Sequence, residues 1–307
     1  MTTLRSRAPA LAIIIAAAMA APLAALDLEA GAFFGNLGLP WAGESPILDD
    51  PYPATQWLYG GRAAFVDDLG GGFSLRAEYV TDTVLRNVVR GLVTYDTGIA
   101  SISAGPMVGV FNTAETLLKA GIDIGFRIEA AGMAFFSATV ESSMGAGLAT
   151  AGDYSQERSE LVAGWYVHNA ICTVSMLTRR YTRMVAGGDS IVDASTDYVF
   201  SVDVYKKGAP YRVVTDLGYS WMTRTYPGDL VDGLGAVKLG ATVSAEVMPT
   251  LTVVVGLDSG IYVFGIEELA GRGPAPASFM FSASLGFVLH LGEGDAAAGH
   301  EALRQAD

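Results

Sequence analysis

The 307-residue sequence has few cysteines, few histidines and few long apolar runs. A single cysteine, Cys172, excludes an intrachain disulfide, and the three histidines show no spacing typical of a metal site. The chain has 32 acidic and 19 basic residues, so we do not expect nucleic acid as a partner. Neither a phosphate-binding loop nor a nucleophile–histidine pair is evident. We therefore expect no cofactor, no metal and no enzymatic activity.

The one long apolar run lies at the N-terminus and has the layout of a secretory signal peptide. Arg5 and Arg7 form a basic segment, residues 11–21 are apolar, and residues 22–25 are small enough for a cleavage site. The run is shorter than the roughly 20 residues that a transmembrane helix needs. We therefore expect a signal peptide over residues 1–25.

Elsewhere the apolar residues alternate with polar ones. They make up 51% of the chain, and the mean hydropathy is +0.36. In residues 116–129, Leu118 and Phe126 fall on one face of a strand, whereas Lys119 and Arg127 fall on the other. A period of two is typical of β-strands with one apolar and one polar face. The pattern recurs along almost the whole mature chain, which favours a membrane-spanning sheet over a soluble sandwich.

Fourteen segments show this alternation, each near the length of about 9 to 11 residues that a tilted transmembrane strand requires. They span residues 26–37, 56–67, 73–82, 85–95, 99–111, 116–129, 133–144, 157–168, 171–182, 195–206, 211–222, 236–247, 251–263 and 278–291. Short turns alternate with longer connections at residues 38–55, 145–156, 183–194, 223–235 and 265–277. A spanning sheet must close on itself, because hydrocarbon offers no partners to backbone N–H and C=O groups.

The predicted fold is therefore all-β, a transmembrane antiparallel up-and-down β-barrel of about fourteen strands. The barrel covers residues 26–291, and residues 292–307 form a flexible periplasmic tail. An even strand number and short turns on one side are typical of bacterial barrels. We expect the outer membrane of a diderm, Gram-negative bacterium as the location, membrane lipid as a partner, and both termini in the periplasm.

Charged residues of both signs fall on the predicted inner face, since an Arg or Lys facing lipid at mid-depth costs about 2–4 kcal/mol. The predicted pore-lining residues are Arg62, Arg76, Glu78, Arg90, Lys119, Asp123, Arg127, Glu141, Arg179, Asp203, Arg212, Asp216, Lys238 and Asp258. Small inner residues such as Gly240 and Ser284 leave space for water. Opposite charges have a second interpretation, in which they pair across strands and stiffen the wall. We expect the loop at 38–55 to be an exposed surface loop, and the alternative is that it folds inward and narrows the pore.

In this overall pattern the chain resembles bacterial outer-membrane barrels, and in length and strand number it is similar to monomeric fourteen-stranded porins of the OmpG type. We expect a passive channel for small hydrophilic solutes or ions, with a weak cation preference from the acidic balance. One alternative is a surface adhesin or structural barrel with a closed lumen. Another is an outer-membrane hydrolase, for which His168 has no evident hydroxyl partner in the sequence. The sequence does not fix the oligomeric state.

Overall fold

The computed structural model describes a barrel wall and its short turns. The described residues are 25–35, 58–81, 87–111, 117–130, 132–143, 154–184, 189–205, 209–228, 230–265 and 279–292. The predicted signal peptide up to residue 24, the loop at 38–55 and the tail beyond residue 292 lie outside them. In the described part no helix is long and apolar enough to cross a membrane.

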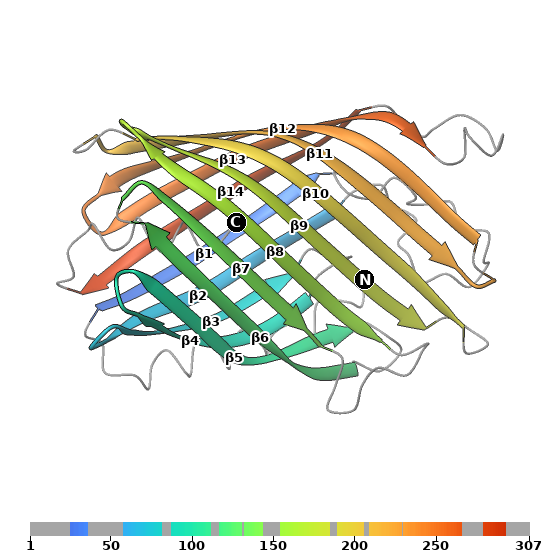
Figure 1. The fold of residues 1–307 in the computed structure, drawn as a ribbon, viewed down its shortest axis with the longest axis horizontal. Helices are drawn as coiled ribbons and strands as arrows, with labels where there is room; N and C mark the ends of the chain where they lie inside the picture. Colours follow the sequence, from blue (N-terminus) through green and yellow to red (C-terminus); the bar gives the residue numbers. More distant parts are fainter. Residues whose placement is uncertain are drawn as a thin grey trace, which may run out of the picture.

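The described residues form fourteen antiparallel strands that close into one barrel (Figure 1). Each strand pairs with its neighbours in chain order, and β1 pairs with β14 from Ala25 opposite Gly292 to Gly35 opposite Ser282. The strands are β1 Ala25–Gly35, β2 Leu58–Gly70, β3 Phe73–Thr81, β4 Asn87–Asp96, β5 Ala100–Phe111, β6 Leu117–Ala130, β7 Ala134–Ser142, β8 Ser155–Val167, β9 Ala170–Met184, β10 Ser190–Tyr205, β11 Tyr211–Tyr226, β12 Leu230–Met248, β13 Leu251–Gly265 and β14 Phe279–Gly292. The predicted up-and-down barrel is confirmed.

Two predicted loops are wrong over most of their length. Strand β9 continues to Met184 and β10 begins at Ser190, so residues 183–194 are mainly strand. Strand β11 continues to Tyr226 and β12 begins at Leu230. The alternation persists in these segments, but the outward positions Ser190, Thr223 and Thr225 carry hydroxyl groups instead of apolar side chains. That polarity resembled the polarity of a loop.

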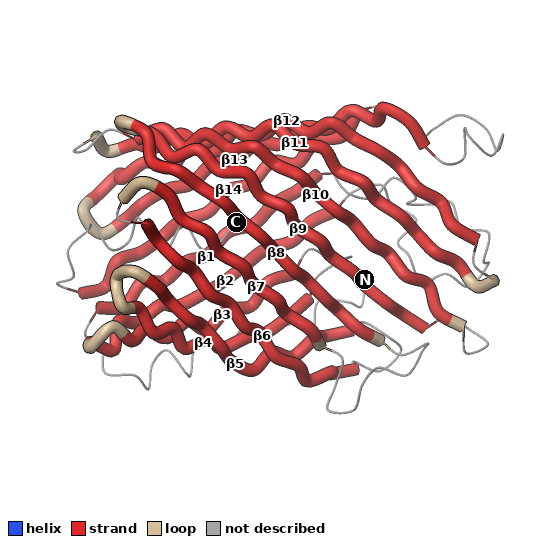
Figure 2. The backbone as a smooth tube through the Cα atoms, in the orientation of Figure 1, coloured by secondary structure: helices blue, strands red, loops and turns tan. Residues whose placement is uncertain are grey.

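Most of the described turns gather at one end of the barrel (Figure 2). We call this the short-turn end, and the opposite end the loop end. The β8–β9 turn places Asn169 at a φ of 59°, in the left-handed region that Asn tolerates better than most residues. The turn between β6 and β7 uses Gly132 at a φ of 71°. Turn chemistry and strand alternation therefore specify the same hairpins.

The outer face of the barrel is apolar. On β6, Ile122, Ile124 and Ile128 are between 48% and 53% exposed, whereas the intervening Asp123 is 2% exposed. Burial of apolar surface in water would require these isoleucines to point inward. An apolar outer face with charged residues on the inside is the arrangement of a barrel whose surroundings are hydrocarbon.

The apolar band ends before the strands do on one side of the barrel. On β8 and β9 the outward positions change from Leu161 and Met176 to Ser159 and Thr178, whose hydroxyl oxygens lie 2.5 Å apart. Exposed Arg180 follows on the same face. Strands β10–β12 reach further toward the loop end than β3–β5 (Figure 1). This part of the wall therefore rises beyond the apolar band.

An arginine at the middle of the outer band tests the assignment of the two faces. We predict that Ile124→Arg lowers the free energy of unfolding by about 2–4 kcal/mol in lipid, because the guanidinium would face hydrocarbon. Thr225→Arg, at an outward position near the loop end of β11, should change it by about 1 kcal/mol or less. Guanidinium titration of the barrel in liposomes measures both. Equal losses in the two variants would contradict the assignment.

Candidate functional site on the inner face of the barrel

Ion pairs between strands that are not neighbours identify the inner face. Arg76 on β3 contacts Glu29 on β1 with an Nη2–Oε2 distance of 2.9 Å, although β2 lies between them. Arg90 on β4 contacts Glu141 on β7, with 2.9 Å between Nη1 and Oε2. In a closed wall, side chains of non-neighbouring strands meet across the concave side. The alternation then assigns the other charged residues to the same face.

A continuous chain of ion pairs begins at β1. The Glu29 carboxylate accepts hydrogen bonds from Arg62 Nη2 at 2.5 Å and from both Nη atoms of Arg76 at 3.1 and 2.9 Å. Arg76 also donates from Nε to Glu78 Oε2 at 3.3 Å. Each charge therefore has a neighbour of opposite sign.

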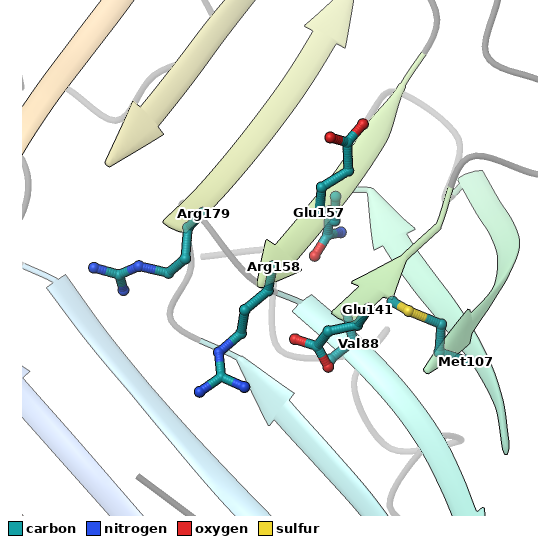
Figure 3. A pocket seen from close by; sticks show the side chains of 7 residues that line it. Val88, Met107, Glu141, Glu157, Arg158 and Arg179 are labelled. Carbon is teal, nitrogen blue, oxygen red and sulfur yellow. The ribbon is translucent and has the colours of Figure 1, made fainter. Parts of the chain in front are cut away.

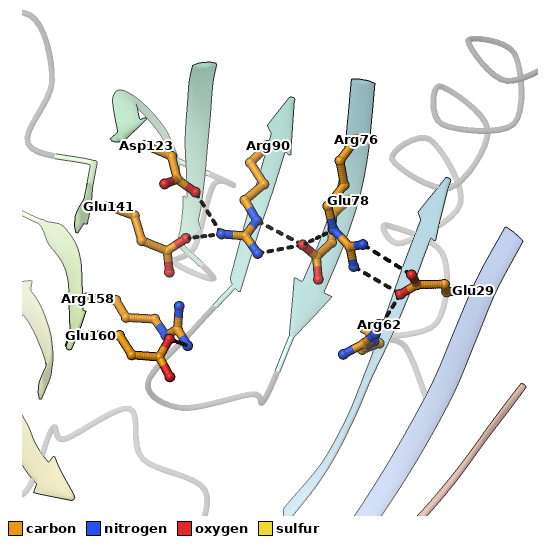
Figure 4. Close-up of polar contacts among 9 residues, drawn as sticks. All are labelled: Glu29, Arg62, Arg76, Glu78, Arg90, Asp123, Glu141, Arg158 and Glu160. Atoms are coloured by element: carbon orange, nitrogen blue, oxygen red, sulfur yellow. Dashed lines mark hydrogen bonds and ion pairs between the residues drawn. The ribbon is translucent and has the colours of Figure 1, made fainter. Parts of the chain in front are cut away.

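The chain continues from Glu78 to Arg90 and ends at two further carboxylates (Figure 4). Arg90 lies 2.6 Å from Glu78, 2.7 Å from Asp123 and 2.9 Å from Glu141. Its side chain is 9% exposed, and those of the three acids are 2–3% exposed. We name these seven residues the β1–β7 ion-pair chain: Arg62, Glu29, Arg76, Glu78, Arg90, Asp123 and Glu141.

Arg90 is the centre of this chain for an electrostatic reason. Asp123 and Glu141 stand directly opposite each other in the β6–β7 register, an arrangement that is unfavourable for like charges. The Arg90 guanidinium donates one nitrogen to both of them and two nitrogens to Glu78. A planar guanidinium with several donors suits this role, because a buried carboxylate is costly unless it is paired and hydrogen-bonded.

A second cluster lies on β9, β10 and β12. Asp197 binds two cations, with 2.8 Å to Arg179 Nη2 and 2.8 Å to Lys238 Nζ. Arg179 also donates from Nε to Ser195 Oγ at 3.1 Å. Since β11 lies between Asp197 and Lys238, this pair also crosses the concave side.

Other ion pairs line the same face between these two clusters and toward both ends. They are Arg158–Glu160 at 2.7 Å, Arg224–Asp193 at 2.7 Å, Arg127–Glu129 at 3.3 Å, and Arg212–Asp203. A hydrogen bond of 2.8 Å between His290 Nδ1 and Asp27 Oδ1 lies on the same face. His290 and Asp27 belong to the last and first strands, so their contact lies at the seam where the barrel closes.

A small cavity lies among β4, β5, β7, β8 and β9 (Figure 3). It gives about 10 Å³ to the centre of a water molecule, which is room for about one water. It is lined by Val88, Met107, Glu141, Gln156, Glu157, Arg158 and Arg179. Arg158 and Arg179 stand opposite each other in the β8–β9 register. Each also has its own carboxylate partner, which offsets their mutual repulsion.

Eleven of the fourteen residues predicted to line a pore belong to the ion pairs described above. They are Arg62, Arg76, Glu78, Arg90, Asp123, Arg127, Glu141, Arg179, Asp203, Arg212 and Lys238. The other three, Lys119, Asp216 and Asp258, also fall at inward positions of the alternation. A Cβ added at Gly240 would lie 2.4 Å from Asp258 Oδ1 and 3.2 Å from Asp216 Oδ2, so these two acids flank that glycine.

Several inner residues were missed by the sequence analysis. Arg224, Asp193 and Gln156 fall in segments that were predicted to be loops. Arg224 follows Met222 by two positions, and both are buried. Continuing the period of two past a polar outward residue would have placed it on the inner face.

The described residues offer little for metal binding or catalysis. No group of three or more His, Cys, Asp or Glu in this part of the chain could hold a metal ion. His168 is exposed in the β8–β9 turn. Cys172 is half-buried at an outward position of β9, alternating with inward Ile171.

Comparison with protein-family models found no match, and a search of curated proteins also found none. Solved barrels are similar in fold. An anion-selective porin from Comamonas acidovorans aligns over 87% of this chain and 98% of its own, at 9% identity and a TM-score of 0.40. The NanC porin aligns over 87% and 100%, at 11% identity and a TM-score of 0.44. A bacterial polysaccharide outer membrane secretin aligns over 88% and 98%, at 9% identity and a TM-score of 0.46. The likeness concerns barrel architecture alone.

Removing the central guanidinium tests the β1–β7 ion-pair chain. We predict that Arg90→Met lowers the free energy of unfolding by about 3–5 kcal/mol, because three buried carboxylates lose a shared partner. Arg180→Met removes an exposed arginine from the outer face and should change it by about 0.5 kcal/mol or less. Denaturant titration in liposomes provides the measurement.

A double variant separates charge from packing. Adding Asp123→Asn to Arg90→Met should restore part of the lost free energy of unfolding, since it removes the negative charge opposite Glu141. If Arg90→Met and Arg180→Met have the same free energy of unfolding, the β1–β7 ion-pair chain does not stabilise the wall.

Proposed function

We propose that this protein is an outer-membrane channel for passive diffusion of small hydrophilic solutes or ions in a diderm bacterium. The observation that carries the proposal is the polarity of the closed wall, which is apolar outside and charged inside. A barrel of this size falls between small filled barrels and the larger porins with aqueous channels. Short turns at one end and longer connections at the other support periplasmic termini.

Small inner residues support an aqueous path along part of the wall. Adjacent inward positions on β12–β14 carry glycine or hydroxyl side chains. They are Gly240, Thr242, Ser244, Gly256, Ser282, Ser284 and Gly286. Such side chains occupy little of the interior and offer hydrogen bonds to water. The proposed path lies next to this stretch of wall.

Charges beside this path would set its selectivity. Asp216 and Asp258 flank Gly240 on neighbouring strands, and both are partly accessible. Rings or pairs of carboxylates favour cations where they line a conduction path. Together with the formal net charge of −13, these acids support a weak cation preference.

The second candidate function is a surface or structural barrel with a closed lumen. The observation that favours it is the burial of the β1–β7 ion-pair chain, whose paired charges serve as a stiff wall. Single-channel current distinguishes the two candidates because a closed lumen carries none.

We predict stepwise, reproducible current from the refolded mature protein in a planar bilayer under a salt gradient, with a reversal potential of the sign for cation preference. The charged inner face and the small residues on β12–β14 are the physical reason. A folded barrel without current would contradict the channel and favour the structural barrel with a closed lumen. A reversal potential of the opposite sign would contradict the cation preference alone.

Neutralising the acids beside Gly240 tests their role in selectivity. Asp216→Asn and Asp258→Asn are each expected to lower the cation-to-anion permeability ratio, by roughly twofold, because each removes a negative charge from the path. Glu157→Gln makes the same charge change at an outward position of β8. Its carboxylate points away from Arg158 and Glu141 (Figure 3), so the ratio should stay unchanged. Reversal potentials under identical gradients measure all three. An equal effect from Glu157→Gln would show that net charge, not position, sets the preference.

A further inference from the structure

Strand β7 leaves the plane of the wall at its loop end. Ser142 still pairs with Ile122 on β6, and the β6–β7 pairing ends there. A Cβ added at Gly121 would lie 1.9 Å from Ser142 O and 2.6 Å from Ser143 Cα. Gly121 occupies an inward position of β6, so Ser143, which follows β7, lies over the inner face of β6 at this glycine.

Ser143 extends across β6 as far as β5. A Cβ added at Gly109 on β5 would lie 2.7 Å from Ser143 Oγ and 2.9 Å from Ser143 Cβ. A side chain at either glycine would occupy the place of this segment. Gly109 and Gly121 therefore form a cradle for a backbone that folds into the barrel.

The start of β8 lies on the inner side of the wall next to Ser143. The backbone N–H of Ser143 donates to Gln156 O at 2.9 Å, and the backbone N–H of Gln156 donates to Ser143 Oγ at 2.9 Å. Ser143 is 0% exposed and Gln156 is 3% exposed. The two residues behave as one unit on the inner face.

The Gln156 side chain fastens this unit to β4 and β5. Its Oε1 accepts a hydrogen bond from Asn87 N at 2.7 Å, and its Nε2 donates to Asn87 O at 3.1 Å and to Val110 O at 3.2 Å. The acceptor and the two donors of the amide match these three backbone groups. A carboxylate offers no donors and would leave the two carbonyls without this partner. We name Asn87, Val110, Ser143 and Gln156 the Gln156 latch.

Aromatic rings pack next to the latch. The Phe111 ring centroid lies 5.2 Å from that of Tyr154 and 5.4 Å from that of Tyr181. Phe111 is 0% exposed. Gln156 also lines the cavity next to Glu141, Arg158 and Arg179. The latch therefore lies beside the charged part of the inner face.

We propose that the Gln156 latch limits the open cross-section of the barrel on the β4–β8 side, which makes Gln156 a size-determining residue of the proposed channel. The inference deepens the proposed function and rests on it for its physiological meaning. The latch holds backbone over the inner faces of β6 and β5, in space that a simple cylindrical wall leaves open. Breaking its hydrogen bonds frees this backbone to return to the wall.

Single-channel conductance of Gln156→Ala tests the latch. We expect conductance to rise by roughly 1.5- to 3-fold over the unsubstituted protein, or current to appear where that protein has none, because the pore cross-section increases. Ser159→Ala is the matched control on the same strand, since it removes a hydrogen bond at an outward position. Its conductance should equal that of the unsubstituted protein. Circular dichroism checks that each variant is folded.

A second variant acts on the same contact from the opposite side. Gly121→Ala places a methyl group where Ser142 and Ser143 lie, so the inward segment must move away. We expect its conductance to change in the same direction as that of Gln156→Ala. Gly91→Ala, where an added Cβ meets nothing within 4 Å, is the matched control and should have no effect.

The outcomes separate this inference from the proposed function. Absence of current in the unsubstituted protein, with current in Gln156→Ala, would overturn the passive channel but support the latch. Equal conductance, or no current in either protein, would overturn the latch. Should Gln156→Ala not fold, a rise in Gly121→Ala supports the latch and equal conductance overturns it.

Discussion

The structure depends on one constraint, which is that backbone N–H and C=O groups in hydrocarbon must find partners in the protein itself. Fourteen strands meet it by closing, with β1 paired to β14 over the whole length of β1. Closure then fixes where side chains point, because a period of two sends alternate residues to lipid and to the interior. The charges of the inner face follow from this: once they are removed from bulk water, Glu29, Glu78 and Asp123 require arginines nearby.

Charged and small side chains are distributed unevenly over the inner face. The β1–β7 ion-pair chain packs charged groups against one part of the wall, whereas β12–β14 present glycine and hydroxyl side chains. The two parts have different physical roles. Paired guanidinium and carboxylate groups hold strands at a defined curvature, and small side chains occupy little of the space next to them. The Gln156 latch belongs to the first part, where a glycine cradle lets backbone fold inward.

The class of fold was predictable from the sequence because alternation is a local property that each strand carries by itself. The inner position of Arg90 or Asp123 followed directly from it. The ion-pair partners of these residues could not be predicted from the alternation, since Arg90 contacts Glu141 only because the four strands β4–β7 curve. The latch could not be predicted for the same reason. Gln156 and Asn87 are 69 residues apart, and no local sequence pattern indicates that they are in contact. The inward position of Arg224 was not predicted because the outward hydroxyl groups of Thr223 and Thr225, suited to a wall above the apolar band, resembled a loop.

The β1–β7 ion-pair chain also bears on the order of assembly. All seven of its members lie between residues 29 and 141, so each of its three arginines and four carboxylates has a partner of opposite charge within the first seven strands. Bare charges enter a bilayer at high cost, and a curved sheet of these strands would already have them paired. The N-terminal half can thus form with these buried charges already paired. The seam pair of His290 and Asp27, separated by 263 residues, is left to the final step.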